Sequence, residues 1–327
     1  MLAALMVFLP PRLPADTGYY AVTQLAISNA VHPSIDNHGE IVWAGQNGGG
    51  IYSSVRGQLS ATGQSPHITN SGEVVYADSF GGSGLDLVSS TRGRLTTGGV
   101  IDLGFSDFGI NTNGEVVYVA LDSNSLHQVY STIRGQITFD PVDHYNPCIN
   151  DHGEILYNRY GEGPGLVSTT RGPLPGLDPT IYSVNNFDEF CYVGNLMSGP
   201  LSTSPHLFSS VHGVVVNDAY QYQFGGGIND AGTLVWWAQG NVGVTTYIFE
   251  AVWAASPSVT LVSRNPGLAL QWPTNAGAFQ PQYSTNLAST NWLPLGGGRV
   301  TNAGYILQTI ATNLGNRAFF KLSMGPP

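Results

Sequence analysis

Near its start the chain reads Ile35-Asp36-Asn37-His38-Gly39-Glu40-Ile41-Val42-Trp43, and five more copies of this pattern follow in its 327 residues. The pattern is an apolar residue, Asn or a polar substitute, two small or polar residues, Gly, Glu, two apolar residues and an aromatic. The later copies occupy residues 68–76, 110–118, 149–157, 184–192 and 228–236. A second block, Ser-Val-Arg-Gly-Gln-Leu at residues 54–59, recurs at 90–95, 132–137, 169–174 and 210–215. A tandem repeat of this kind limits the fold more than any other feature of a sequence.

The spacing of the copies favours a β-propeller. The turn residues lie at positions 39, 72, 114, 153, 188 and 232, so the steps are 33, 42, 39, 35 and 44 residues. Blade-forming repeats are commonly ~40–50 residues long. Each copy contains four short runs of β-branched and aromatic residues separated by Gly-rich breaks, which predicts four antiparallel strands. Over residues 17–256 we therefore expect a propeller of about six four-stranded blades, with five or seven as alternatives.

The two ends of the repeat region suggest how the ring closes. After the sixth copy, residues 247–253 fit a third strand, but Pro257 interrupts the position of a fourth. Before the first copy, residues 19–25 resemble the segment 51–59. We expect this early strand to become the outer strand of the last blade, because that pairing covers an exposed sheet edge.

The repeat stops near residue 257, and the organisation changes. Residues 257–327 contain about six short strand patterns with Asn- and Gly-rich turns, which predicts a small C-terminal β-sandwich. Residues 1–15 resemble the apolar core of a signal peptide, although a basic first region is missing and the segment could be truncated. That segment is too short to span a bilayer, and no other run is apolar for long enough, so no membrane span is expected.

Composition narrows the range of partners. Charged residues make up only 10% of the chain, the net charge is −10, and Lys and Arg are not clustered. A nucleic-acid partner and an anionic membrane surface are therefore both disfavoured, and we expect no nucleic-acid partner. No cofactor motif is present, and no Cys/His spacing typical of a metal site, so no cofactor and no metal are expected. We expect a monomer.

Two parts of the chain resemble modules of bacterial extracellular proteins. The stretch Ile228-Asn229-Asp230-Ala231-Gly232 resembles the Ile-Asn-x-x-Gly turns of the HAF-type bacterial extracellular repeats, over roughly residues 27–253, although the His-Ala-Phe triplet is absent. The tail segments 270–273, 283–287, 291–292 and 317–322 resemble a C-terminal module of large secreted bacterial proteins. The second resemblance implies a fibronectin-III-like sandwich on an exported protein and implies no catalysis.

The polar residues of the repeat have a structural interpretation. The Asn or Asp before each turn could be a cation ligand, but an Asx turn with a left-handed Gly explains it more simply. The series is Asp36, Asn111, Asn150, Asn185 and Asn229, broken by Thr69. The recurring Glu and Arg residues are expected to pair between strands or blades, as scaffold charges do in repeat proteins.

The aromatic residues and the cysteines leave alternatives open. Each copy ends in one aromatic residue, and this set either packs between blades or forms a platform for sugar stacking: Trp43, Tyr76, Tyr118, Tyr157, Tyr192 and Trp236. Cys148 and Cys191 lie in successive copies. They could form a cross-repeat disulfide in an exported protein, or remain two buried thiols.

The function that these observations favour is binding or scaffolding outside the cell or at its surface. Propeller loops would recognise a polysaccharide or a surface protein without covalent chemistry. One alternative is a hydrolase of extracellular glycan that uses acids from unrepeated loops, such as Asp78, Asp86, Asp107 or Asp122. Another is a purely structural envelope component. In each case function is expected where the copies differ, at residues 78–86, 101–108, 121–128, 140–147 and 195–206.

Overall fold

The computed structural model describes residues 18–81, 84–99, 108–160, 165–174, 180–195, 205–215, 222–239, 245–255, 259–263, 268–273, 279–285, 292–302, 305–310 and 318–324. Its regular elements are β-strands, apart from one short 3-10 turn, η1 (Gln46–Gly48). The chain forms two compact units. One is Val22–Trp253, and the other combines Met1–Ala21 with Ala254–Pro327.

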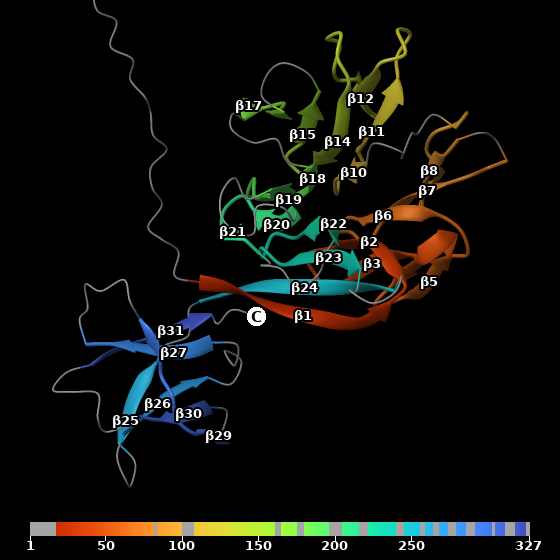
Figure 1. Cartoon of the computed structure of the whole chain (residues 1–327). Helices are drawn as coiled ribbons and strands as arrows, with labels where there is room; N and C mark the ends of the chain where they lie inside the picture. Colours follow the sequence, from red (N-terminus) through yellow and green to blue (C-terminus); the bar gives the residue numbers. More distant parts are fainter. Residues whose placement is uncertain are drawn as a thin grey trace, which may run out of the picture. The chain divides into compact units, whose positions relative to one another are not determined.

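Each copy of the repeat forms one antiparallel sheet of four strands, which we number in chain order (Figure 1). Sheet 1 contains β2 (Ala30–Ile35), β3 (Ile41–Gly45), β4 (Ile51–Ser53) and β5 (Gly57–Ser60). Sheet 2 contains β6 (Gln64–Ile68), β7 (Val74–Asp78), β8 (Asp86–Ser89) and β9 (Gly93–Arg94). Sheet 3 contains β10 (Gly109–Ile110), β11 (Val116–Leu121), β12 (His127–Ser131) and β13 (Gly135–Gln136).

The second half of the repeat region continues in the same order. Sheet 4 contains β14 (His144–Ile149), β15 (Ile155–Arg159), β16 (Leu166–Ser168) and β17 (Gly172–Leu174). Sheet 5 contains β18 (Thr180–Val184), β19 (Phe190–Asn195), β20 (Pro205–Ser209) and β21 (Gly213–Val214). Sheet 6 contains β22 (Tyr222–Ile228), β23 (Leu234–Gln239) and β24 (Thr246–Ala255), and its outer strand is β1 (Gly18–Ser28).

The first strands of the six sheets form a closed cycle. Each one contacts the first strands of the sheets before and after it, and β22 of sheet 6 returns to β2 of sheet 1. Within every sheet the remaining strands follow outward in order. Four-stranded sheets arranged in this way around a central channel are a β-propeller, so the expected all-β propeller fold is confirmed.

The ring closes through the strand that the sequence suggested. In sheet 6 the order is β22, β23, β24 and β1, so the outer strand comes from the start of the chain (Figure 1). The Asn29 amide, just after β1, also donates to the carbonyl of Thr246 at the start of β24. The edge of β24 is therefore paired rather than exposed, which removes a site for unwanted strand addition.

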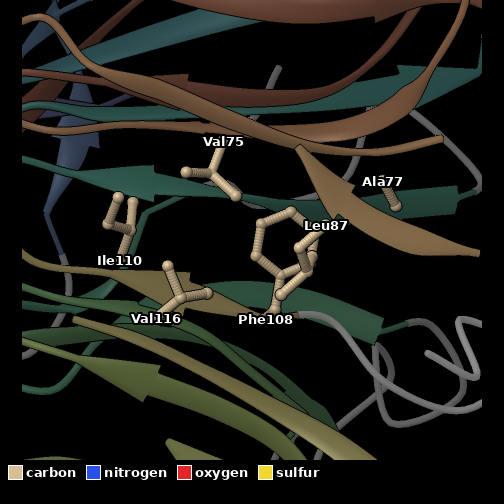
Figure 2. Packing of buried hydrophobic residues seen from close by; sticks show 6 residues of the cluster. All are labelled: Val75, Ala77, Leu87, Phe108, Ile110 and Val116. Carbon is tan, nitrogen blue, oxygen red and sulfur yellow. The ribbon is translucent and has the colours of Figure 1, made fainter. Parts of the chain in front are cut away.

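Apolar side chains fill the spaces between neighbouring sheets. Figure 2 shows one such cluster, in which Val75, Ala77 and Leu87 of sheet 2 meet Phe108, Ile110 and Val116 at sheet 3. Similar clusters join sheets 1 and 2, sheets 3 and 4, and sheets 4 and 5. Sheets 2, 3 and 4 are therefore apolar on both faces, which explains why their strands carry near-continuous rather than alternating apolar residues.

A β-bulge recurs in the first strand of five sheets. The strand register shifts there between the first and second strands of sheets 1, 2, 4, 5 and 6. Three residues at these positions, His32, Ser65 and Asn146, have φ near +50°. A bulge increases local twist. The sequence did not predict it, because the bulged residues share no residue type.

The tail forms two antiparallel sheets around one apolar cluster. One sheet has the order β25 (Thr260–Ser263), β26 (Leu268–Pro273), β30 (Tyr305–Thr309) and β29 (Arg299–Asn302). The other has the order β28 (Leu293–Pro294), β27 (Phe279–Ser284) and β31 (Phe319–Met324). Leu270, Trp272, Leu295 and Ile310 form the centre, and Tyr283 and Phe320 of the second sheet pack against it. These are the layers that a small sandwich needs.

Candidate functional site

The polar residue before each turn, usually Asn, caps that turn. In sheet 4, Asn150 Oδ1 accepts the amides of His152 and Glu154 at 3.1 and 3.0 Å. Asp36, Asn185 and Asn229 make the same pair of bonds, and Asn111 Oδ1 accepts the amide of Glu115. The following turn glycines have φ between +71° and +81°, a region that other residues rarely adopt. The Asx-turn interpretation is therefore confirmed.

The same side chains also join neighbouring sheets, which the sequence did not reveal. The amide groups of Asn111, Asn150 and Asn185 each donate to the carbonyl of the equivalent residue in the next sheet, at 3.3, 3.4 and 3.0 Å. Asn229 donates across the closure to the carbonyl of Asp36 at 3.1 Å. Asp36 and Thr69 lack an amide group and cannot donate in this way.

The residue that follows each capping residue in the sequence is also polar. These six residues form a circle that we call the turn ring: Asn37, Asn70, Thr112, Asp151, Asn186 and Asp230. The backbone amide of one member donates to the side-chain oxygen of the next at 2.7–2.9 Å, in five junctions. Burial opposes charge on Asp151, but hydrogen bonds from Thr112, Asn186 and Asn70 outweigh it and lower the pKa of that carboxyl. The turn ring thus ties the sheets together at one end of the channel.

The turn ring surrounds a small polar cavity. The cavity has a volume of about 60 Å³ and is lined by the first strands and by turn residues such as Asn70, Asp151 and Asp230. This volume holds a few water molecules and is far below the ~300–1,000 Å³ of a typical ligand pocket. The carboxylate and amide groups that face it are already bonded to one another.

The recurring Glu and Arg residues pair within their own sheets. In sheet 2, Glu73 accepts the Ser89 hydroxyl and, at 2.6 Å, Arg92 Nε. The same Glu–Ser–Arg arrangement occurs at Glu40, Glu115 and Glu154. Arg92 and Arg134 additionally donate to the turn carbonyl of the next sheet, Gly114 and Gly153. These charges are therefore scaffold, and they act both within and between blades.

The six repeat aromatics lie on the second strand of each sheet, and all but Trp236 pack against an apolar cluster. Trp43, Tyr118, Tyr192 and Trp236 stack on an aromatic residue of the third strand. Tyr76 and Tyr157 pack against the clusters of sheets 1–2 and 3–4. Trp236 is only 1% exposed. Their placement matches packing, the first of the two interpretations, and ligand contact by these residues stays a prediction.

Of the two alternatives for the cysteines, the structure matches the buried thiols, because Cys148 and Cys191 are buried and are not joined in a disulfide. Cys148 packs in a cluster with Phe190 and beside Tyr192, the two neighbours of Cys191 in β19. Side chains alternate along a strand, so Cys191 points to the opposite face, where its sulfur approaches the Gly226 carbonyl at 3.6 Å. Burial, with Glu189 nearby, raises the pKa of Cys191 to about 12.

The acids named for a hydrolase have structural partners. Asp86 is buried and bonds to Arg94 and Thr96. Asp78 accepts the Thr62 hydroxyl at 2.7 Å. Asp122 caps its own turn by accepting the amides of Asn124 and Leu126. Asp107 lies outside the described residues. Within the ranges described, no group of three or more His, Cys, Asp or Glu side chains is arranged to hold a metal ion.

The opposite end of the sheets, which we call the loop face, carries loops that differ between copies. It contains the connections between second and third strands and between successive sheets. At the junction of sheets 3 and 4, two of the loops expected to carry function come together. Asp143 accepts the His127 amide at 2.8 Å and its Nδ1 at 3.2 Å. Asp140 accepts Arg159 Nε at 2.7 Å, and His144 Nε2 lies 3.0 Å from its other oxygen.

Aromatic rings border these charges, and the whole group is named the junction cluster: His127, Asp140, Asp143, His144, Tyr145, Arg159 and Tyr160. Tyr145 lies between His127 and Tyr160, with ring centroids 5.3 and 6.4 Å away. Tyr160 is 70% exposed. Buried Gln128 donates to the carbonyls of Asp140 and Val142, so the loop that carries both acids is held in place.

The electrostatics of the junction cluster keep its acids charged. The His127 amide is the main cause that lowers the pKa of Asp143. Burial opposes charge on Asp140, but Arg159 and His144 outweigh it and lower the pKa of that carboxyl. Burial lowers the pKa of His144 despite Asp140. At neutral pH the cluster thus presents two carboxylates, one guanidinium and the exposed phenol ring of Tyr160.

Comparisons with known proteins find solved structures that resemble this fold at low sequence identity. No family model matches the chain, and no curated protein matches it. A putative TolB from Agrobacterium tumefaciens matches with a TM-score of 0.44 and 15% identity, over 68% of this chain and 90% of that one. A streptogramin B lyase matches with a TM-score of 0.40 and 10% identity, over 74% of this chain and 100% of that one. The β-propeller domain of the Trilobed protease from Pyrococcus furiosus matches with a TM-score of 0.40 and 10% identity, over 77% of this chain and 90% of that one.

These structural neighbours are propellers. Their names include enzymes, such as the lyase, and a protein not named as an enzyme, the putative TolB. The similarity is too low to transfer any activity to this chain, and the fold assignment rests on the strand topology described above. Among the described residues, no helix is long and apolar enough to cross a membrane. The propeller fold is consistent with a binding or scaffold role.

Proposed function

We propose that this protein is a non-enzymatic binding module that recognises a polysaccharide through the junction cluster on its loop face. The observation that supports this most is the exposed Tyr160 beside the charged pairs Asp140–Arg159 and Asp143–His127. The face of an aromatic ring provides flat apolar area for the C–H face of a sugar. Charged planar groups beside it can bond to neighbouring hydroxyls.

The way in which the cluster is built supports the same function. The loop that carries both acids is fixed by Gln128, and the Tyr160 amide donates to the Asp143 carbonyl at 2.9 Å. Preformed polar groups lose less entropy when a ligand binds. Tyr160 is exposed at the surface, where a long polymer can reach it as easily as a small molecule. A cell-surface or extracellular location is part of this proposal, and it rests on the resemblance of the tail to modules of secreted proteins.

The test is a binding panel of soluble dextran, laminarin, xylan, chitin oligosaccharides and bacterial capsular polysaccharide. Retention of one polymer class without release of reducing ends is the expected result. Tyr160→Ala should weaken that binding about three- to tenfold, the usual value of one aromatic contact. Asp143→Asn should also weaken it, because the carboxylate charge is lost while the shape is kept.

Phe187→Ala is the matched control, since Phe187 is an equally exposed aromatic residue, 75% accessible, at the turn-ring end of sheet 5. The Phe187→Ala variant should bind the polysaccharide with the same affinity as the unchanged protein. Release of reducing ends would identify a glycan hydrolase instead. Failure to bind any polymer, together with binding to a surface protein or self-association, would contradict the proposal and favour the protein-binding or structural alternative.

A further inference from the structure

The tail, residues 257–327, differs from the rest of the chain in charge. It contains four bases, Arg264, Arg299, Arg317 and Lys321, and no Asp or Glu, so its side chains carry +4. The whole chain carries −10, so the remaining residues carry −14. A charge asymmetry between two parts of a chain is a sequence signal for a charged partner. Because charges are screened over about 8 Å at physiological ionic strength, acids further away than that do not cancel the bases of the tail.

The strand register places Lys321 on the outer face of the three-stranded sheet of the tail. Lys321 of β31 lies opposite Gln282 of β27, which lies opposite Pro294 of β28. Phe320 and Leu322, the neighbours of Lys321 in the sequence, pack against the apolar cluster of the tail. Since side chains alternate along a strand and opposite residues share a face, Lys321 and Gln282 point away from that cluster.

Aromatic and amide groups surround Lys321 on this face. Its Nζ lies 4.7 Å from the centroid of the Trp292 ring, within the range of a cation–π contact. Phe319, two residues before Lys321 on β31, shares the face, and Gln280 shares it from β27. Arg299 Nη2 donates to Gln280 Oε1, so a second cation reaches the same place. We call this set the basic face: Gln280, Gln282, Trp292, Arg299, Phe319 and Lys321.

The groups of the basic face match the chemistry of an acidic polysaccharide. The faces of aromatic rings provide flat apolar area for the C–H face of a sugar. Side-chain amides can donate to sugar hydroxyls and accept from them, and cations form charge-assisted bonds to carboxylates. No acid of the tail competes for the two cations, because the tail contains none.

Two other polyanions fit the basic face less well. A lipid surface is bound by large apolar side chains that insert into it. Those that are exposed in the described part of the tail lie elsewhere, on the four-stranded sheet or, for Leu293, on the cluster side of β28: Leu261, Leu268, Leu293, Val300 and Tyr305. A duplex nucleic acid is bound through many phosphate contacts, whereas the whole tail has four bases.

We propose that the tail is a second binding module, which holds the protein on an acidic polysaccharide through the basic face. The ligand differs in charge from one that would suit the propeller part of the chain, since the −14 outside the tail repels a polyanion and the +4 of the tail attracts it. The proposal does not depend on the function of the junction cluster.

The test is affinity electrophoresis of the full chain in gels that contain polygalacturonate, with fully methyl-esterified polygalacturonate as the matched neutral polymer. We expect retardation by the acidic polymer only. Binding should weaken when NaCl is raised from about 50 to about 500 mM, because salt screens exposed charges.

Variants assign the binding to the basic face. Lys321→Gln should weaken it about two- to fivefold, the range of one exposed ion pair, and Lys321→Arg should keep it because the charge remains. Trp292→Ala should weaken it about two- to tenfold. Its matched control is Tyr305→Ala, an exposed aromatic residue on the other sheet, which should bind as the unchanged protein does. The melting temperature of each variant shows that the tail is still folded.

Equal retardation by the acidic and the esterified polymer would overturn the proposal, as would unchanged binding by a folded Lys321→Gln variant. Phosphatidylglycerol vesicles and duplex DNA are the competing probes, and both should bind more weakly than polygalacturonate. Tighter binding of either one, reduced by Lys321→Gln, would assign the basic face to a lipid surface or a nucleic acid and contradict the proposal.

Discussion

The two ends of the propeller sheets obey different rules. At the turn-ring end, the same few bonds recur from copy to copy. All six turns have a side-chain cap, the four Asn caps also link to the next sheet, and sheets 1 to 4 carry a Glu–Ser–Arg group. At the loop face, the junction cluster of sheets 3 and 4 has no counterpart in the motif. Residues that recur in every copy of this chain are therefore needed for folding. Residues that differ between copies indicate where binding occurs.

The largest expected effect tests whether the repeat aromatics are core residues. Trp236 is buried and stacks on Phe249 with ring centroids 5.5 Å apart. Trp236→Ala should lower the free energy of unfolding by about 3–5 kcal/mol, measured by urea denaturation. Tyr160→Ala at the loop face should change it by less than about 0.5 kcal/mol. A stable Trp236→Ala protein that loses polysaccharide binding would assign this aromatic to a sugar platform.

The next effect concerns the links between turns. Asn150 caps its turn and donates to the Asn185 carbonyl, so Asn150→Ala removes bonds within sheet 4 and to sheet 5. The expected loss is about 2 kcal/mol in the same denaturation assay. Asn124→Ala, in an exposed loop-face turn, is the control and should cost less than about 0.5 kcal/mol. Equal losses in the two variants would show that the Asn150 cap and its link to sheet 5 add nothing to the stability of the ring.

The same contrast explains how much of the molecule could be predicted from the sequence. The fold, the turn caps and the closing strand were predicted, because each depends on residue types that recur at fixed spacing. The links from Asn150 to Asn185 and through Asp151 were missed, because a local cap already explained the side chains. The junction cluster was located only as two loops. No rule of spacing says that His127 meets Asp143, since that contact depends on how two sheets pack.

A smaller effect tests the scaffold charges by pH. Burial opposes charge on Glu73, but Ser89 and Arg92 outweigh it and lower the pKa of this group below its ordinary 4.5. A lowered acid pKa adds stability above the unfolded value, and this stability is lost as the pH falls through the folded pKa. Glu73→Gln should therefore cost about 1 kcal/mol at pH 7 and much less below pH 4. A cost that is the same at both pH values would mean that charge plays no part.

The smallest effect concerns the cysteines. Because Cys148 lies against one face of β19 and Cys191 points to the other, a reducing agent should leave the melting temperature unchanged. Alkylation of the unfolded, unreduced protein should label both thiols, as read by intact mass. A melting temperature that falls when the reducing agent is added, together with no labelling of the unreduced protein, would show that the two cysteines form a disulfide.

The most direct test of the contrast between the two ends is hydrogen exchange of the full chain with and without the polysaccharide retained in the panel. We expect slower exchange at residues 121–128, 138–146 and 159–160 on binding, and unchanged exchange at the motif turns 36–40, 150–154 and 185–189. Protection at the motif turns with none in the junction cluster would contradict the assignment of binding to the loop face.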